Sequence, residues 1–176
     1  MRHVTIFLTA IVFAAAMQSG LGAGSDNRLP FPSGYREWVW LSSGFGMTYS
    51  EGAGAPQFDN VFVDRASWSV FEQTGHWPDK TVLVVEERAS ATHGSINKEG
   101  HFQTAMVGLA AHVRDGRLPG GWAFYDFGLS KEPARMIPTT AACYSCHQKS
   151  GAVDTTFVQF YPTALEIAKR KGTVRE

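Results

Sequence analysis

The sequence predicts an α+β fold with an antiparallel β-sheet as its core, flanking helices, and a helix that carries a short Cys/His motif near the C-terminus. Residues 81–88 are rich in β-branched side chains, and residues 102–113 place apolar side chains at alternate positions. Residues 122–127 form a third, aromatic β-type segment. Helical patterns gather before and after these segments, which indicates α+β and not a regular alternation of strands and helices.

Residues at the expected ends of helices and strands predict the elements that precede residues 81–88. Ser33 is a candidate N-cap for a short helix over residues 35–41, and residues 42–57 read as strand and loop. Residues 58–63 predict a short strand. Asp64 is a candidate N-cap, and Gly75 a candidate stop, for a helix over residues 65–74.

Three further helices are expected after the sheet. Thr139 or Thr140 is expected to begin the helix that carries the motif, and Asp154 to cap a short helix that reaches residue 160. A last helix is expected over residues 163–171, with Gly172 as its stop. Residues 89–100 are expected to be a polar hairpin loop between two strands.

Residues 1–23 read as a signal peptide, with Arg2 and His3 before an apolar run and small residues after it. Residues 24–176 then form one exported domain, expected in the periplasm. The formal net charge is zero, and no basic stripe indicates a nucleic-acid partner.

Residues 143–147 read Cys-Tyr-Ser-Cys-His, the spacing of a c-type haem attachment site. Two thiols three positions apart reach the two vinyl groups on one porphyrin edge, and the adjacent imidazole points at the iron. We therefore predict one covalently attached haem c, held by Cys143 and Cys146, with His147 as the iron ligand.

Three other interpretations of the motif are weaker. A thioredoxin-like pair usually lies early in a chain, after a strand that opens a βαβ unit. A zinc site would need two further ligands at undefined positions, because the chain has only two cysteines. A disulfide at this spacing is strained unless it is functional.

No methionine or histidine follows His147, so a downstream sixth ligand is excluded. The upstream candidates are Met47, Met106, His76, His93, His101 and His112. We predict five-coordinate iron with one face open to a small molecule.

These residues resemble the cytochrome P460 family. The resemblance rests on residues 143–147 and on residues 154–162, Asp-Thr-Thr-Phe-Val-Gln-Phe-Tyr-Pro. It extends upstream through residues 35–38, 58–63, 75–79 and 94–97, from about residue 30 to residue 168. It implies an antiparallel β fold with flanking helices, and a homodimer.

The family has two functional types. Cytochrome P460 oxidises hydroxylamine and carries a lysine cross-linked to the porphyrin; cytochrome c′-β lacks the cross-link, has a Phe-capped pocket and binds nitric oxide. Residues 81–88 contain no lysine. The candidate aromatic wall is Phe45, Phe58, Phe62, Phe102 and Phe124.

The resemblance leaves hydroxylamine oxidation and nitric oxide binding open, with an unknown redox partner protein. Oxidation needs a carboxylate that accepts protons as electrons leave. Glu86 is the choice for this catalytic role, with Glu87 and Asp126 as alternatives, because an acid facing an apolar cleft has a raised pKa. Simple periplasmic electron transfer is the remaining hypothesis.

Overall fold

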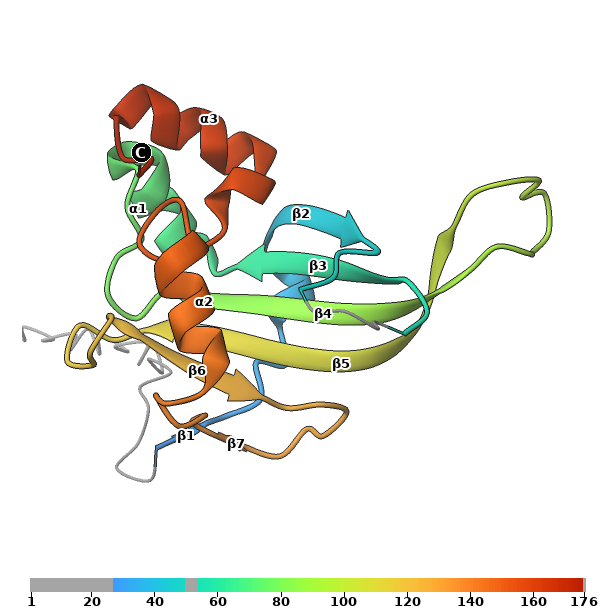
Figure 1. Cartoon of the computed structure of the whole chain (residues 1–176), viewed down its shortest axis with the longest axis horizontal. Helices are drawn as coiled ribbons and strands as arrows, with labels where there is room; N and C mark the ends of the chain where they lie inside the picture. Colours follow the sequence, from blue (N-terminus) through green and yellow to red (C-terminus); the bar gives the residue numbers. More distant parts are fainter. Residues whose placement is uncertain (1–26, 50–53, 176) are drawn as a thin grey trace, which may run out of the picture.

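A computed structural model describes residues 27–49 and 54–175. Its centre is a five-stranded sheet in the order β2-β3-β4-β5-β6, antiparallel at every pairing. Figure 1 shows this sheet with the helices on one side of it. The predicted α+β fold with an antiparallel core is confirmed. The strands are β2 (Val39–Phe45), β3 (Gln57–Val63), β4 (Val82–Ala91), β5 (Phe102–Arg114) and β6 (Trp122–Asp126).

The remaining elements lie around this sheet. Arg28–Leu29 (β1) and Ala134–Arg135 (β7) form a small second sheet. Within the described part of the chain the α-helices are α1 (Arg65–Thr74), α2 (Ala142–Ser150) and α3 (Pro162–Lys171). The described residues also form two 3₁₀ turns, η1 (Tyr35–Glu37) and η2 (Val158–Phe160).

Helix α1 has the boundaries that the sequence predicts. The Asp64 side chain accepts a hydrogen bond from the Ser67 amide at 2.8 Å, which satisfies one free amide of the first turn. Gly75 ends the helix in the left-handed region at φ 76°. Asp64 also accepts from the Val82 amide at 3.0 Å, so the same carboxylate joins α1 to the start of β4.

Other predicted boundaries are wrong. The helix expected over residues 35–41 is only the 3₁₀ turn η1, because the chain extends from Trp38 onward to pair with β3. The N-cap of α2 is Ala141, not Thr139 or Thr140. Asp154 caps no helix; it lies in a tight turn before η2.

The central sheet is buried on both faces. On one face, Leu83, Val61 and Phe124 pack with the helices in a core that includes Phe71 and Trp77. The opposite face packs against the N-terminal segment and the chain around β7; its core is Leu29, Tyr35, Val82, Val84, Leu109, Ala111, Val113, Ala123, Tyr125, Phe127 and Ala134. Burial on both faces means that alternate side chains of one strand enter two different cores.

The helices gather at one end of the sheet, and the β4–β5 hairpin extends from the other (Figure 1). Over residues 27–49 and 54–175, no helix has the length and apolar character needed to cross a bilayer. The predicted signal peptide, residues 1–23, lies outside the described residues.

Candidate haem-binding site

Helix α2 places the three motif side chains together. Cys143, Cys146 and His147 are separated by three and four positions, which puts them on one face of a helix. All three line the same cavity. The two thiols are not joined to each other.

The His147 imidazole is held in one orientation. Its Nδ1 lies 3.0 Å from the carbonyl oxygen of Thr155. Because a carbonyl only accepts hydrogen bonds, Nδ1 carries the proton and Nε2 is left free. The rings of Phe157 and Phe124 pack on the imidazole at centroid distances of 4.2 and 4.8 Å. Burial lowers the pKa of His147, which favours the neutral ring that binds iron.

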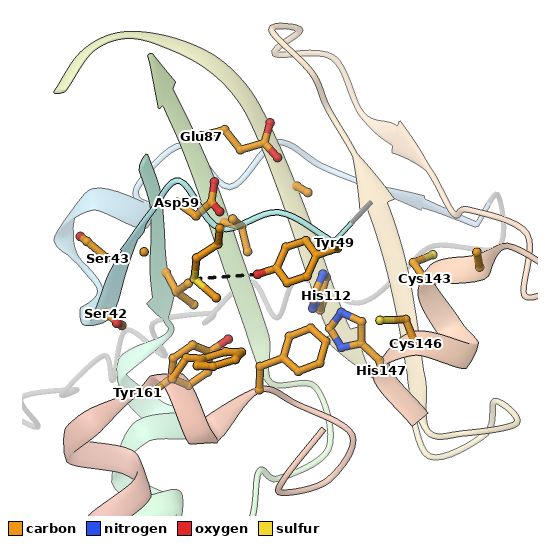
Figure 2. A pocket seen from close by; sticks show the side chains of 18 residues that line it. Ser42, Ser43, Tyr49, Asp59, Glu87, His112, Cys143, Cys146, His147 and Tyr161 are labelled. Carbon is orange, nitrogen blue, oxygen red and sulfur yellow. Dashed lines mark hydrogen bonds between the residues drawn. The ribbon is translucent and has the colours of Figure 1, made fainter. Parts of the chain in front are cut away.

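The cavity has a volume of about 610 Å³ and lies between the helix-covered face of the sheet and the C-terminal segment. Figure 2 shows Cys143, Cys146 and His147 on one side of the cavity and Ser42, Ser43 and Asp59 on the other. The wall is mostly apolar. The lining residues outside the motif are Ser42, Ser43, Gly44, Met47, Tyr49, Asp59, Val61, Val85, Glu87, Ala110, His112, Ala142, Phe157, Phe160 and Tyr161.

Two carboxyl groups lie on the strand side of this cavity. Asp59 of β3 and Glu87 of β4 are directly paired across the sheet, so their side chains share one face. Burial and the Glu87 charge raise the pKa of Asp59 to about 6. Burial and the charge of Asp126 raise the pKa of Glu87. One oxygen of Asp59, Oδ1, is buried and has no hydrogen-bond partner among the described residues.

Gly108 gives the Glu87 carboxyl its space. The two residues are paired across β4 and β5. A Cβ at position 108 would overlap Oε2 of Glu87. A glycine is therefore required there for the carboxyl to lie where it does.

The structure places Glu86, the predicted catalytic acid, away from the cavity. Glu86 points to the opposite face of β4 and does not line the cavity. It is 3% exposed and binds Arg36 and Arg88, at 2.7 and 2.8 Å, as well as the Tyr35 hydroxyl. Its neighbour Glu87, one residue on and hence on the other face, lines the cavity.

Glu86 is a stabilising residue, and its replacement by glutamine is expected to lower the free energy of unfolding by about 2–3 kcal/mol. Burial alone would raise the pKa of the Glu86 carboxyl, but the hydrogen bonds from Arg88, Tyr35 and Arg36 outweigh it, and the pKa is lowered. The stabilisation is therefore complete above the ordinary glutamate pKa, about 4.3, and is lost as pH falls through the lowered value. Urea unfolding of the unmodified protein and of Glu86→Gln, at pH 7 and below pH 4, measures this stabilisation. An equal loss of unfolding free energy at both pH values would contradict this role.

Of the six candidate sixth ligands, Met47 and His112 line the cavity. The His112 ring touches the His147 ring edge to face, with 4.7 Å between centroids, so no iron can lie between them. Met106 lies near the Tyr35 hydroxyl, and His76 near Asp154. His93 and His101 belong to the β4–β5 hairpin, outside the cavity.

The predicted aromatic wall also differs from the observed one. Phe45, Phe58, Phe62, Phe102 and Phe124 do not line this cavity. Its aromatic side chains are Tyr49, Phe157, Phe160 and Tyr161. Phe157 and Phe160 follow the motif helix by a few residues and lie within residues 154–162, one of the stretches on which the family resemblance rests. Asp59 was missed because a single acid inside a short strand has no distinguishing pattern.

The residues present fit a haem group. Two free thiols and an imidazole with a bare Nε2 face a large cavity with apolar walls, which is the donor set of a covalently held porphyrin. Among the described residues, no three His, Cys, Asp or Glu side chains gather where they would hold a bare metal ion. The zinc interpretation therefore lacks its ligands in that part of the chain.

Together, the fold and the site indicate a haem-binding cytochrome with an α+β domain. Residues 32–158 match the family model described as Cytochrome P460. This chain belongs to the cytochrome P460 family, and haem binding follows from that membership. No curated protein matches the sequence.

Proposed function

We propose that this chain is an exported mono-haem c-type cytochrome that oxidises hydroxylamine or a related small nitrogen compound. Its haem would be attached through Cys143 and Cys146, with His147 as the iron ligand. The observation that carries the proposal is the pair of carboxyl groups, Asp59 and Glu87, on the wall of the cavity that the three motif side chains face. When bound, the haem supplies an iron that binds the substrate nitrogen and takes up its electrons.

The chain's own residues would handle the protons. Each electron removed from hydroxylamine is accompanied by a proton, and a carboxylate near the reacting nitrogen accepts it. Carboxyl groups with raised pKa values are suited to this role near neutral pH. Oδ1 of Asp59 accepts no hydrogen bond from any described residue, so it is available to accept a proton. The electrons would leave to a redox partner protein.

This proposal predicts a pH dependence. Because burial and Glu87 raise the pKa of Asp59 to about 6, Asp59 is mostly protonated below pH 6 and cannot accept a proton there. The rate constant calculated for unprotonated hydroxylamine, a correction needed because the substrate amine itself titrates in this range, is expected to rise with pH, with a midpoint near pH 6. Stopped-flow reduction of the ferric protein by hydroxylamine between pH 4.5 and 8 measures it. A flat profile over this range would exclude Asp59 from proton transfer.

Nitric oxide binding without turnover is the second candidate. The described residues that line the cavity include no lysine that could be cross-linked to the porphyrin, and the family resemblance associates hydroxylamine oxidation with such a cross-link. Excess hydroxylamine with an artificial electron acceptor distinguishes the two. Repeated reduction of the acceptor supports oxidation, whereas nitric oxide binding to the ferrous protein without acceptor reduction supports gas binding.

Simple electron transfer is favoured only by Met47, whose thioether lines the cavity. A Met47 ligand would give six-coordinate, low-spin iron. The open site proposed here gives a high-spin spectrum that changes when small ligands are added.

The location and assembly belong to the same proposal. Residues 1–23 would direct export to the periplasm and be removed. A homodimer is expected from the family resemblance, and light scattering of the purified holoprotein tests it.

A further inference from the structure

The carbonyl that contacts His147 belongs to a strained turn. Thr156 N donates to Val153 O at 2.7 Å, and the two residues form an isolated antiparallel bridge. The central residues, Asp154 and Thr155, have φ values of 46° and 61°. Two positive φ values are the pattern of a type I′ turn, which normally takes Asn-Gly. A β-branched threonine is an outlier there and persists only where its surroundings impose the conformation.

The Asp154 side chain supplies much of that constraint. One carboxylate oxygen accepts from the Trp77 amide at 2.8 Å and lies 3.1 Å from an Arg114 nitrogen. The other lies 3.1 Å from Nδ1 of His76. The backbone carbonyl of Asp154 accepts from the Trp122 indole at 2.7 Å. These contacts attach the turn to β5, to β6 and to the segment after α1.

Gly151 closes the turn from the other side. It is the C-cap of α2, at an ordinary φ of −71°. A Cβ at this position would lie 2.7 Å from both Cα and O of Thr155, which are backbone atoms that cannot swing aside. The carbonyl that contacts His147 is thus packed directly against the end of the motif helix.

We infer that Asp154 is a positioning residue for the iron ligand. It holds the Asp154–Thr155 turn in its strained conformation, so that the Thr155 carbonyl stays against Nδ1–H of His147. This inference rests on the proposed role of His147 as the iron ligand. A hydrogen bond to the second nitrogen of a ligating imidazole fixes its tautomer and raises its basicity. A more basic imidazole favours ferric iron, so Asp154 acts on the potential without touching the haem.

The test compares haem-loaded Asp154→Ala and Gly151→Ala with the unmodified protein. The first variant removes the side-chain anchors of the turn, and the second displaces the same Thr155 carbonyl while Asp154 is kept. Both are expected to lower the iron–histidine stretching frequency of the ferrous protein. Both are expected to raise the reduction potential, shifting the ferrous-to-ferric ratio at a fixed potential by about threefold to tenfold. A tenfold shift is about 59 mV for a one-electron couple.

A rescue and a matched control separate this role from a general loss of structure. Replacing both residues, as Asp154→Gly with Thr155→Gly, is expected to restore the frequency and potential, because both positions have positive φ and glycine adopts it without strain. Asp115→Ala removes another carboxylate paired with an arginine, Arg117 at 2.7 Å, and is expected to change neither. Unchanged frequency and potential in haem-loaded Asp154→Ala would overturn the inference. If that variant does not accumulate with haem, Gly151→Ala decides by the same criterion.

A readout without haem keeps this inference distinct from the proposed function. In the full chain lacking haem, the imidazole ¹⁵N shifts of His147 report which nitrogen carries the proton. The unmodified chain is expected to show the Nδ1–H form, and Asp154→Ala an increased share of Nε2–H. Failure of haem attachment with a changed tautomer ratio would contradict the proposed function, and with it the role in iron ligation, but would leave the orienting of the His147 imidazole by Asp154 standing. An unchanged tautomer ratio would contradict the inference alone.

Discussion

Replacing His147 by glycine is expected to leave haem attached through the two cysteines but to remove the protein ligand from its iron. The ferrous iron–histidine vibration should disappear. Hydroxylamine oxidation should fall about 100-fold, because the ligand and the groups that orient it set the reactivity of the metal. Added imidazole should restore part of the activity, since the space left by the side chain fits it. Resonance Raman spectroscopy and steady-state turnover measure these effects.

His112 provides the matched control, because it is the other histidine of the cavity and touches the His147 ring. His112→Phe keeps an aromatic ring against Phe124, which His112 contacts at a centroid distance of 4.4 Å. This variant is expected to retain the iron–histidine vibration. Loss of the vibration in His112→Phe together with its survival in His147→Gly would reverse the ligand assignment.

Replacing Glu87 by glutamine is expected to lower hydroxylamine oxidation by about 100-fold or more, the usual contribution of a positioned proton acceptor. Haem content and ferric spectrum should be unchanged, since Glu87 faces the cavity from the strand side. The midpoint of the pH profile should also move below pH 6, because the Glu87 charge contributes to the raised pKa of Asp59. Turnover at pH 5 to 8, normalised to haem, measures both effects.

Glu86→Gln is the control for this variant, one residue away on the same strand. It should lose stability and keep its turnover per haem, because Glu86 binds Arg36 and Arg88 on the far face of the sheet. The reverse pattern, with turnover lost in Glu86→Gln and kept in Glu87→Gln, would restore Glu86 as the catalytic acid.

The sequence predicts a helix or strand correctly where residues at the ends of that element, such as capping residues, set its limits. The limits of α1 follow from Asp64 and Gly75, which satisfy the terminal backbone groups by side-chain capping and positive φ. The segment after η1 was different. Residues 38–41 suit a helix as well as a strand, and pairing with β3, which lies later in the chain, decides between them.

The alternation of side chains along β4 does not show whether Glu86 or Glu87 faces the cavity. Alternation places the two acids on opposite faces, but both faces of β4 are buried, so both sets of neighbours are apolar. The face of β4 that carries Glu87 becomes the cavity wall because α2 lies across the cavity from it. The role of Asp154 was hidden for a related reason, because its partners Trp77 and Arg114 are distant in sequence.

That the three motif residues lie together was predictable, because it depends only on their spacing along a single helix. Cys143, Cys146 and His147 need only one turn of α2 to share a face. The cavity opposite them could not be predicted in this way, because its sheet wall combines residues of β2, β3, β4 and β5.

Peptide mapping by mass spectrometry of the protein, expressed in a host able to mature c-type cytochromes, tests the central claim most directly. The account predicts one peptide containing Cys143 and Cys146 that carries the mass of one haem, with neither thiol open to alkylation. A bare polypeptide mass with both thiols alkylated would contradict it.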